Sequence, residues 1–153
     1  MEFVKGCGKE AEIEVNDKGG KQSKTEYALH LLDGKFLQML GEENTDFVFD
    51  RLGDFFQNGN KAVLLDVVER VGDTCEDALL KIGEVLKEGA EKYTVNNWRL
   101  ISQEEHINHA LIHYIAWLKH DTQDNHLGHF LTRIMMAYAT EKSEKFSYTE
   151  YIG

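Results

Sequence analysis

Six of the seven histidines in this chain fall between His106 and His129, and Asp121 and Asp124 lie in the same stretch. Imidazole nitrogens and carboxylate oxygens are the usual mixed ligands of Mn, Fe, Co, Ni and Zn ions. Magnesium would rely instead on the carboxylates, on substrate phosphates and on water. Histidine also exchanges protons near neutral pH. The stretch therefore predicts a metal site or a site that handles phosphate groups.

The spacing of these histidines fits two consecutive helices with about 100° of turn per residue. On the first helix, one polar stripe beside the apolar face comprises His106, His109, His113 and His120. On the second helix, a stripe at the same angular position comprises His126, His129 and Arg133. Packed as an antiparallel hairpin, the helices would turn both stripes toward one cleft at the edge of the core. Two simpler interpretations stay open: hydrogen-bonded boundary histidines, and Asp121 and Asp124 as caps of the second helix.

Two other segments offer contacts for a phosphate or a base. The flexible cationic run 18–24 contains Lys21 and leads into an expected helix start, although it does not match a Walker A loop. Asn97, Trp98 and Arg99 combine amide edges, an aromatic face and a guanidinium, which could stack on a base or grip a phosphate. The alternatives are a solvated loop for the first segment and a buried tryptophan that anchors a connector for the second.

Other catalytic patterns fit less well. His120 and Asp121 form an H-D pair, but the HD phosphohydrolases need a later aspartate, and none follows Asp124. The stripe formed by Glu84, Glu88 and Glu91 is better explained as a solvated helix face. There is no G-x-S-x-G motif, and Cys75 has no histidine beside it in the sequence.

The elements that must position these residues are helices. Apolar periodicity and capping patterns predict helices over about 25–39, 45–57, 61–71, 74–93, 102–119 and 125–141. Ser23 with Glu26, and Ser102 with Glu105, are predicted to be capping boxes. We therefore expect an all-α, single-domain bundle of five to six helices over residues 25–141, preceded by an irregular Gly/Lys-rich segment at 1–24 and followed by a tail at 142–153.

The composition narrows the class of protein. A chain of 153 residues with 42% hydrophobic residues can form one domain with a core, and a net charge of −10 argues against binding long nucleic acid. Neither a signal peptide nor a membrane-spanning run is expected. Cys7 and Cys75 are interpreted as reduced thiols, which indicates a cytoplasmic protein.

Several motifs occur together in a fixed order: K-G-G-K-Q-S at 18–23, G-A-E-K-Y at 89–93, N-N-W-R at 96–99, H-x-x-H-A-x-x-H at 106–113 and D-T-Q-D-N-H-L-G-H at 121–129. Over about 18–40 and 78–140 the chain resembles the phage-type family described as dATP/dGTP diphosphohydrolase, N-terminal. The resemblance implies a virus-encoded helical protein in the cytoplasm of an infected bacterium, acting on purine deoxynucleotides. Residues 42–73 look like an acidic helical insertion relative to that family.

The resemblance also assigns roles to residues. The motif positions it implies for the site are His109, His113, Asp121, Asp124, His126 and His129. The substrate contacts it implies are Lys21, Asn97, Trp98 and Arg99, and we add Arg133 as a phosphate clamp and His109 as a further contact.

Our leading hypothesis is a nucleotide phosphohydrolase that releases a monophosphate and pyrophosphate. His113, Asp121 and Asp124 would be catalytic, and Asp121, Asp124, His126 and His129 would hold a divalent metal, Mg or Mn before Zn, Co, Ni or Fe. The first alternative is a non-catalytic viral protein that sequesters nucleotides, including cyclic ones used in host defence. The family label describes an N-terminal domain, and the absence of a following catalytic module would fit this alternative. The second alternative is a purely structural interaction protein, and a homo-oligomer is expected only by analogy.

Overall fold

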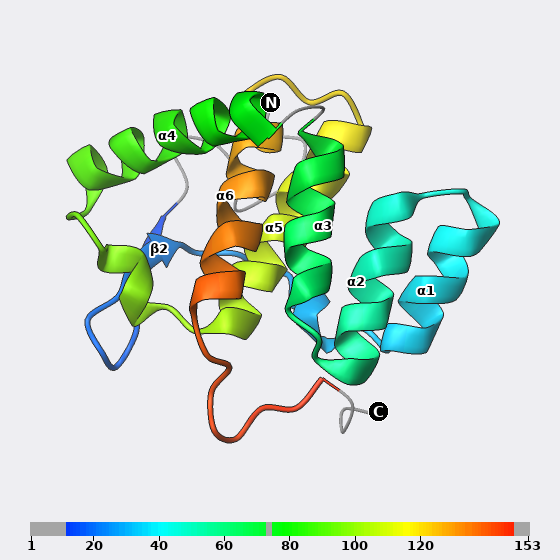
Figure 1. The fold of residues 1–153 in the computed structure, drawn as a ribbon. Helices are drawn as coiled ribbons and strands as arrows, with labels where there is room; N and C mark the ends of the chain where they lie inside the picture. Colours follow the sequence, from blue (N-terminus) through cyan, green and yellow to red (C-terminus); the bar gives the residue numbers. More distant parts are fainter. Residues whose placement is uncertain (1–11, 73–74, 149–153) are drawn as a thin grey trace.

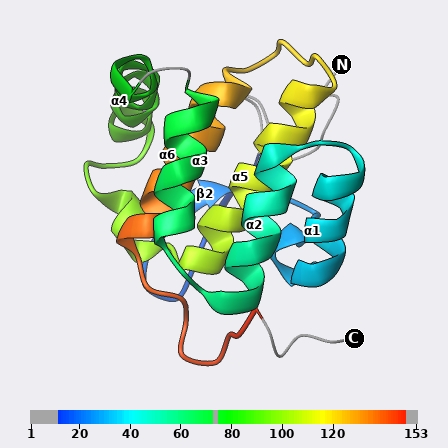
Figure 2. The ribbon, with the colours of Figure 1, turned by 45° about the vertical axis from the view of Figure 1, so that its right-hand side comes forward.

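The computed structural model describes residues 12–72 and 75–148, and in this part α-helices dominate. Four helices, α2 (Phe47–Asn58), α3 (Ala62–Val71), α5 (Gln103–Leu118) and α6 (His126–Ala139), run side by side, and α1 (Gly34–Glu43) flanks α2 (Figure 1). The helix α4 (Cys75–Lys92) lies across the others, as the turned view in Figure 2 also shows. The predicted all-α single-domain bundle is confirmed.

From residue 12 onward, where the structure describes it, the segment before the bundle is more regular than expected. Strands β1 (Ile13–Val15) and β2 (Lys21–Ser23) form an antiparallel hairpin in which Glu14 pairs with Gln22. A 3₁₀ turn, η1 (Leu29–Leu31), follows. The helix predicted over 25–39 is therefore wrong at its start, because Ser23 belongs to β2 and α1 begins only after Asp33. The Asp33 side chain caps α1 by accepting a hydrogen bond from the backbone N–H of Phe36.

The other helices match their predicted ranges closely. Asp46 caps α2 by accepting from the backbone N–H of Phe49, and Gly59 ends it with a left-handed φ of 70°. After α4, the predicted connector forms a 3₁₀ turn, η2 (Asn97–Leu100). At α5 the predicted capping box does not form, because the Ser102 side chain makes no capping hydrogen bond.

The hydrophobic core lies where α2, α3, α5 and α6 meet. Its largest fully buried side chains include Phe55, Leu64, Ile107, Leu111 and Phe130. The segment 42–73 thus supplies a large share of the core, whether or not it is an insertion relative to the family. Described residues of the predicted tail also join the core, since Tyr148 is buried and stacks on Phe56.

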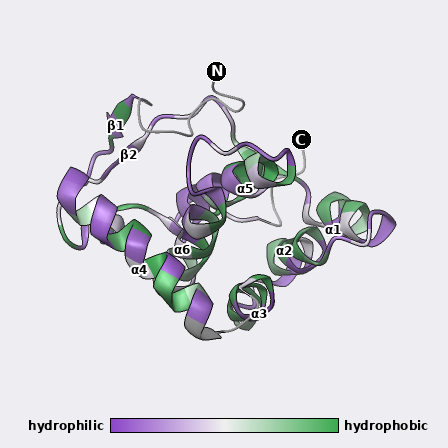
Figure 3. Ribbon diagram, turned by 90° about the horizontal axis from the view of Figure 1, so that it is seen from above, coloured by the Kyte–Doolittle hydropathy of each residue, from purple (hydrophilic) through white to green (hydrophobic). Residues whose placement is uncertain are grey.

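Figure 3 separates the molecule into two sides: α3, α2 and α1 stand in a row, while α4 and the β-hairpin lie on the other side of α6 and α5. Apolar side chains of α4 remain exposed at Leu79, Leu80 and Leu86. No helix in residues 12–72 and 75–148 combines the length and hydrophobicity that a bilayer crossing requires.

Candidate functional site

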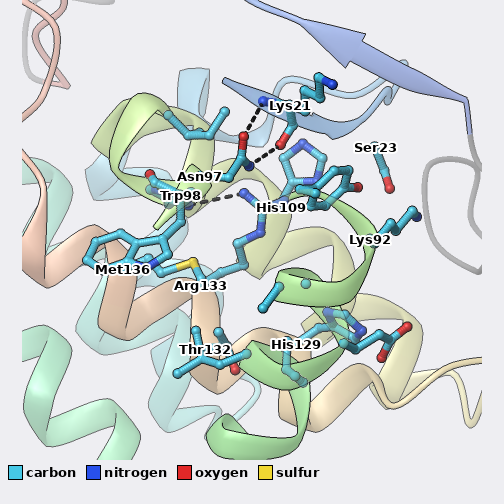
Figure 4. A pocket seen from close by; sticks show the side chains of 18 of the residues that line it. Lys21, Ser23, Lys92, Asn97, Trp98, His109, His129, Thr132, Arg133 and Met136 are labelled. Carbon is cyan, nitrogen blue, oxygen red and sulfur yellow. Dashed lines mark hydrogen bonds between the residues drawn. The ribbon is translucent and has the colours of Figure 1, made fainter. Parts of the chain in front are cut away.

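A cavity of about 380 Å³ opens between α4, η2 and the seam of α5 and α6 (Figure 4). Its polar lining includes Lys21 and Ser23 of β2, Glu88 and Lys92 of α4, Asn97 of η2, three histidines of α5, and Asp124, His129, Thr132 and Arg133. Tyr93, Trp98 and Met136 provide apolar and aromatic surface. The volume falls in the range typical of small-molecule sites.

His106 has a hydrogen-bond arrangement that fixes its proton. Its Nε2 lies 3.0 Å from the Trp98 carbonyl oxygen, which only accepts, and its Nδ1 lies 3.1 Å from Nη1 of Arg133, which only donates. The ring must therefore be neutral with the proton on Nε2. Burial, followed by the charge of Arg133, lowers the pKa of His106 to about 3, which agrees with this assignment.

Arg133 connects this histidine to the β-hairpin. The same Nη1 donates to Oε1 of Gln22 at 3.0 Å, and Nε2 of Gln22 donates to Glu14 (3.1 Å) and to Glu105 (3.2 Å). A continuous polar chain therefore runs from η2 through α5 and α6 to both strands. It fixes the position of the guanidinium in the cavity wall.

The centre of the α5–α6 seam contains a second polar chain, built on His113. Its Nδ1 lies 2.9 Å from Nδ1 of His126, whose Nε2 lies 3.5 Å from a carboxylate oxygen of Asp121. The His126 and Asp121 side chains are only 1% and 4% exposed. Burial, together with the neighbouring His129 and His126, lowers the pKa of His113. His113 is therefore neutral, and one of the two facing Nδ1 atoms carries the shared proton.

His129 and Asp124 form a separate pair that borders the cavity. The His129 ring stacks on His113 with centroids 4.6 Å apart, and its Nε2 lies 3.3 Å from Asp124. Burial favours the neutral form of Asp124, but contact with His129 and the backbone N–H of Asn125 outweigh it and hold the pKa of the carboxyl well below its usual range. Asp124 is thus a carboxylate.

The turn between the two helices uses its polar residues for different tasks. Asn125 caps α6 by accepting a hydrogen bond from the backbone N–H of Gly128, so the capping role considered for Asp121 and Asp124 belongs to their neighbour. His120 does not join its predicted stripe. The helix α5 ends at Leu118, and His120 is exposed with a left-handed φ of 63°.

The predicted substrate contacts are only partly brought together. Lys21, Asn97, Trp98, His109 and Arg133 line the cavity, whereas Arg99 is not among its lining residues. The Arg99 guanidinium lies 4.4 Å from the centroid of the Trp98 ring and is exposed. Asn97 has a structural task, because its side-chain amide accepts from the backbone N–H of Lys21 and donates to the carbonyl of the same residue.

The four predicted metal ligands do not form one ligand set. Asp121 pairs with His126 and Asp124 with His129, and His113 lies between the two pairs. Within the described residues, the one group of three imidazole or carboxylate ligand atoms that approach each other within 4.8 Å belongs to Glu14, Glu105 and His109. This group and the buried Gln22 that joins it were not predicted, because residues 1–24 were expected to be irregular and Glu105 was expected to form a capping box with Ser102.

Comparison with known protein families finds a match for this chain. The family described as dATP/dGTP diphosphohydrolase, N-terminal, matches residues 56–149, which is more than half of the chain and includes η2, α5, α6 and most of the cavity wall. No curated protein and no solved structure matches. The insertion predicted at 42–73 stays a prediction. Because the family model matches more than half of the chain, this chain belongs to the dATP/dGTP diphosphohydrolase, N-terminal, family.

Proposed function

We propose that the protein binds a purine deoxynucleoside triphosphate in this cavity and hydrolyses it, with help from a divalent metal, to a monophosphate and pyrophosphate. The family name supports the class of substrate and reaction. The cavity supports it with an aromatic ring, three cationic side chains and a set of buried imidazoles in one space. The observation that carries the proposal is the series of side-chain contacts from Asp121 through His126 to His113 at the cavity wall.

This chain of side chains would make His113 the general base. The Asp121 carboxylate favours a proton on Nε2 of His126, so the neutral His126 ring accepts at Nδ1 from Nδ1–H of His113. Nε2 of His113 then holds a lone pair for a ligand in the cavity. It takes a proton from water as that water attacks the α-phosphorus and the bond to the departing pyrophosphate breaks. Asp121 is a positioning residue in this scheme.

The charged residues would bind the phosphates. Lys21, Lys92 and Arg133 line the same cavity, and Arg133 is held in place by His106 and Gln22. A guanidinium in a fixed position binds phosphate oxygens in a defined geometry. Trp98 and Tyr93 offer aromatic surface for the base. A bound divalent ion would neutralise phosphate charge during the reaction.

The test is direct. Purified full-length protein is incubated with dATP or dGTP and Mn²⁺ or Mg²⁺, and products are followed by ³¹P NMR and chromatography. We expect equimolar monophosphate and pyrophosphate, with a lower kcat and a similar KM for Asp121→Asn. Asp17→Asn, an exposed turn residue of the hairpin, serves as the matched control. Absence of turnover with both metals and both nucleotides would rule out the hydrolase.

One observation favours a second candidate, a protein that binds nucleotides without cleaving them. The predicted metal carboxylates are engaged with histidines, and the cavity has more cations than carboxylates in its lining. Such a site can bind phosphates without metal. Tight binding of dGTP or of a cyclic dinucleotide, followed by recovery of intact ligand after denaturation, would support this function over hydrolysis.

A further inference from the structure

We propose that Glu14, Glu105 and His109 form a divalent-cation site where the β-hairpin meets α5. One ring nitrogen of His109 and one oxygen of each carboxylate all lie within 4.8 Å of one another. Two carboxylates and an imidazole are a donor set that suits Mn²⁺, with Mg²⁺ as a weaker occupant. The role of this cation toward a nucleotide rests on the proposed function, but its binding does not.

The backbone brings the three residues together. Glu105 and His109 are four residues apart on α5, so their side chains share one face of the helix. Glu14 lies at the centre of β1, opposite Gln22 of β2. His109 also lines the cavity, below β2 in Figure 4, so a cation bound here borders the space assigned to the nucleotide.

Gln22 holds the two carboxylates close to each other. Its amide nitrogen donates to Glu14 at 3.1 Å and to Glu105 at 3.2 Å, and only 5% of the residue is exposed. Two carboxylates held near each other repel, and a cation between them removes that repulsion. The amide oxygen of Gln22 accepts from Arg133. The two carboxylates and the guanidinium of Arg133 together carry a formal charge of −1 before a cation binds.

His109 supplies an independent sign of a ligand. The residue is 2% exposed, yet its buried Nε2 has no hydrogen-bond partner. Buried polar atoms in native proteins nearly always have a partner. His109 therefore has a buried ring nitrogen that is free to bind a ligand, on a residue that groups with Glu14 and Glu105. Burial and the charge of Arg133 lower the pKa of His109, which keeps the ring in the neutral form that binds metals.

Glu105 also departs from its local pattern. It stands three residues after Ser102 in a sequence typical of a capping box, but Ser102 makes no capping bond and Glu105 turns to Gln22. Positions where a local rule is broken are often functional positions. The side chain that should stabilise the start of α5 is used in this cluster instead.

The experiment measures metal binding without any nucleotide. Mn²⁺ is titrated into the full chain, and the loss of the free-ion EPR signal gives the affinity. We expect Glu105→Gln and Glu14→Gln to weaken binding by about tenfold or more. Glu12→Gln removes one exposed carboxylate from the same segment and is the matched control. Asp124→Asn tests the alternative ligand set and should bind Mn²⁺ like the unmodified chain.

A second measurement on the unmodified chain does not depend on the folding of variants. In ¹H–¹⁵N spectra of the imidazoles, substoichiometric Mn²⁺ should broaden the His109 signals before those of His120 or His30. Absence of Mn²⁺ binding, equal affinity in the Glu105→Gln and Glu14→Gln variants, or loss of binding only in Asp124→Asn would each overturn the site. Because no turnover is measured, an inactive protein that binds Mn²⁺ here would contradict the hydrolase and leave the cation site intact.

Discussion

The α1–α2 pair and the α5–α6 pair are both antiparallel helix hairpins with short connecting loops (Figure 2). The two pairs differ in the residues that lie between their helices. The first pair packs backbone against backbone. A Cβ added at Gly41 would overlap the backbone of Asp50, and one added at Gly53 would overlap the backbone of Gln38. The second pair encloses His106, His109, His113 and His126, each 6% exposed or less.

The two hairpins therefore differ in how their buried residues affect the stability of the fold. The glycines of α1–α2 let the backbones of the two helices approach closely at Gly41 and Gly53. In α5–α6 the buried imidazoles must stay neutral, which costs free energy whenever the solution is acidic. We therefore expect the two hairpins to respond to different perturbations.

The largest expected effect is on the pH dependence of stability. The folded-state pKa of His106 is about 3, and those of His109 and His113 are also lowered, against about 6.5 in the unfolded chain. The unfolded chain therefore binds more protons below pH 6.5, and the free energy of unfolding falls as the pH drops. Each histidine contributes about 1.4 kcal/mol per pH unit.

Urea denaturation of metal-free protein between about pH 7 and pH 4.5 measures this slope. The His113→Gln variant should lose the slope of one proton, whereas His120→Gln, at an exposed position, should keep the full slope. A stability that is flat over this range would show that the buried histidines are charged.

The next effect is on catalysis. His113→Gln removes the proposed base and should lower kcat by about 10²- to 10⁴-fold, because general base catalysis contributes that much. The unfolding free energy at neutral pH should change far less. Steady-state kinetics of pyrophosphate release, with His120→Gln as the control, checks this. Retained activity would assign the base to another residue.

A substitution in the glycine-packed pair should affect stability alone. Gly53→Ala pushes a methyl group into the backbone of Gln38 and should lower the unfolding free energy by about 1–3 kcal/mol. Gly83→Ala in α4 meets no atom within 4 Å and should raise it by about 0.5–1 kcal/mol. Denaturation midpoints measure both. A loss of kcat per folded molecule in Gly53→Ala would contradict the separation of the two pairs.

The smallest effect concerns the link between the pairs. The Tyr114 hydroxyl on α5 donates to Asp46, the cap of α2, at 2.8 Å. Tyr114→Phe should cost about 0.5–1.5 kcal/mol and leave turnover unchanged. A change in KM with little change in stability would instead mean that contacts on the core side of α5 influence substrate binding in the cavity.

Sequence periodicity predicted much of the fold because the helices from α2 to α6 follow apolar stripes and carry visible stops such as Gly59. It failed before α1, where Ser23 and Glu26 imitate a capping box and the short strands show little alternation. A hairpin of three-residue strands depends on tertiary contacts, here with Asn97 and Glu105. Such contacts are not encoded in local spacing.

The dependence on tertiary contacts also explains why the site was predicted only in part. The two histidine stripes were predicted from angular position, and His106, His113 and His129 do face one cavity. The near-complete burial of His106 and His113 was not predicted, because the spacing of residues along one helix does not reveal how closely other elements pack against it. The pairing of Asp121 with His126 and of Asp124 with His129 depends on the path of the connecting turn. Glu14, the residue contributed by the hairpin, comes from more than 90 positions away from His109.

The double hydrogen bond between Asn97 and Lys21 protects backbone groups that an edge strand would otherwise leave unpaired. Lys21 turns its backbone N–H and carbonyl away from β1, and the Asn97 amide occupies both groups. An open strand edge is a template for aggregation. One side chain therefore occupies the outward backbone groups of Lys21, and Asn97→Ala would expose a place where a foreign strand could add.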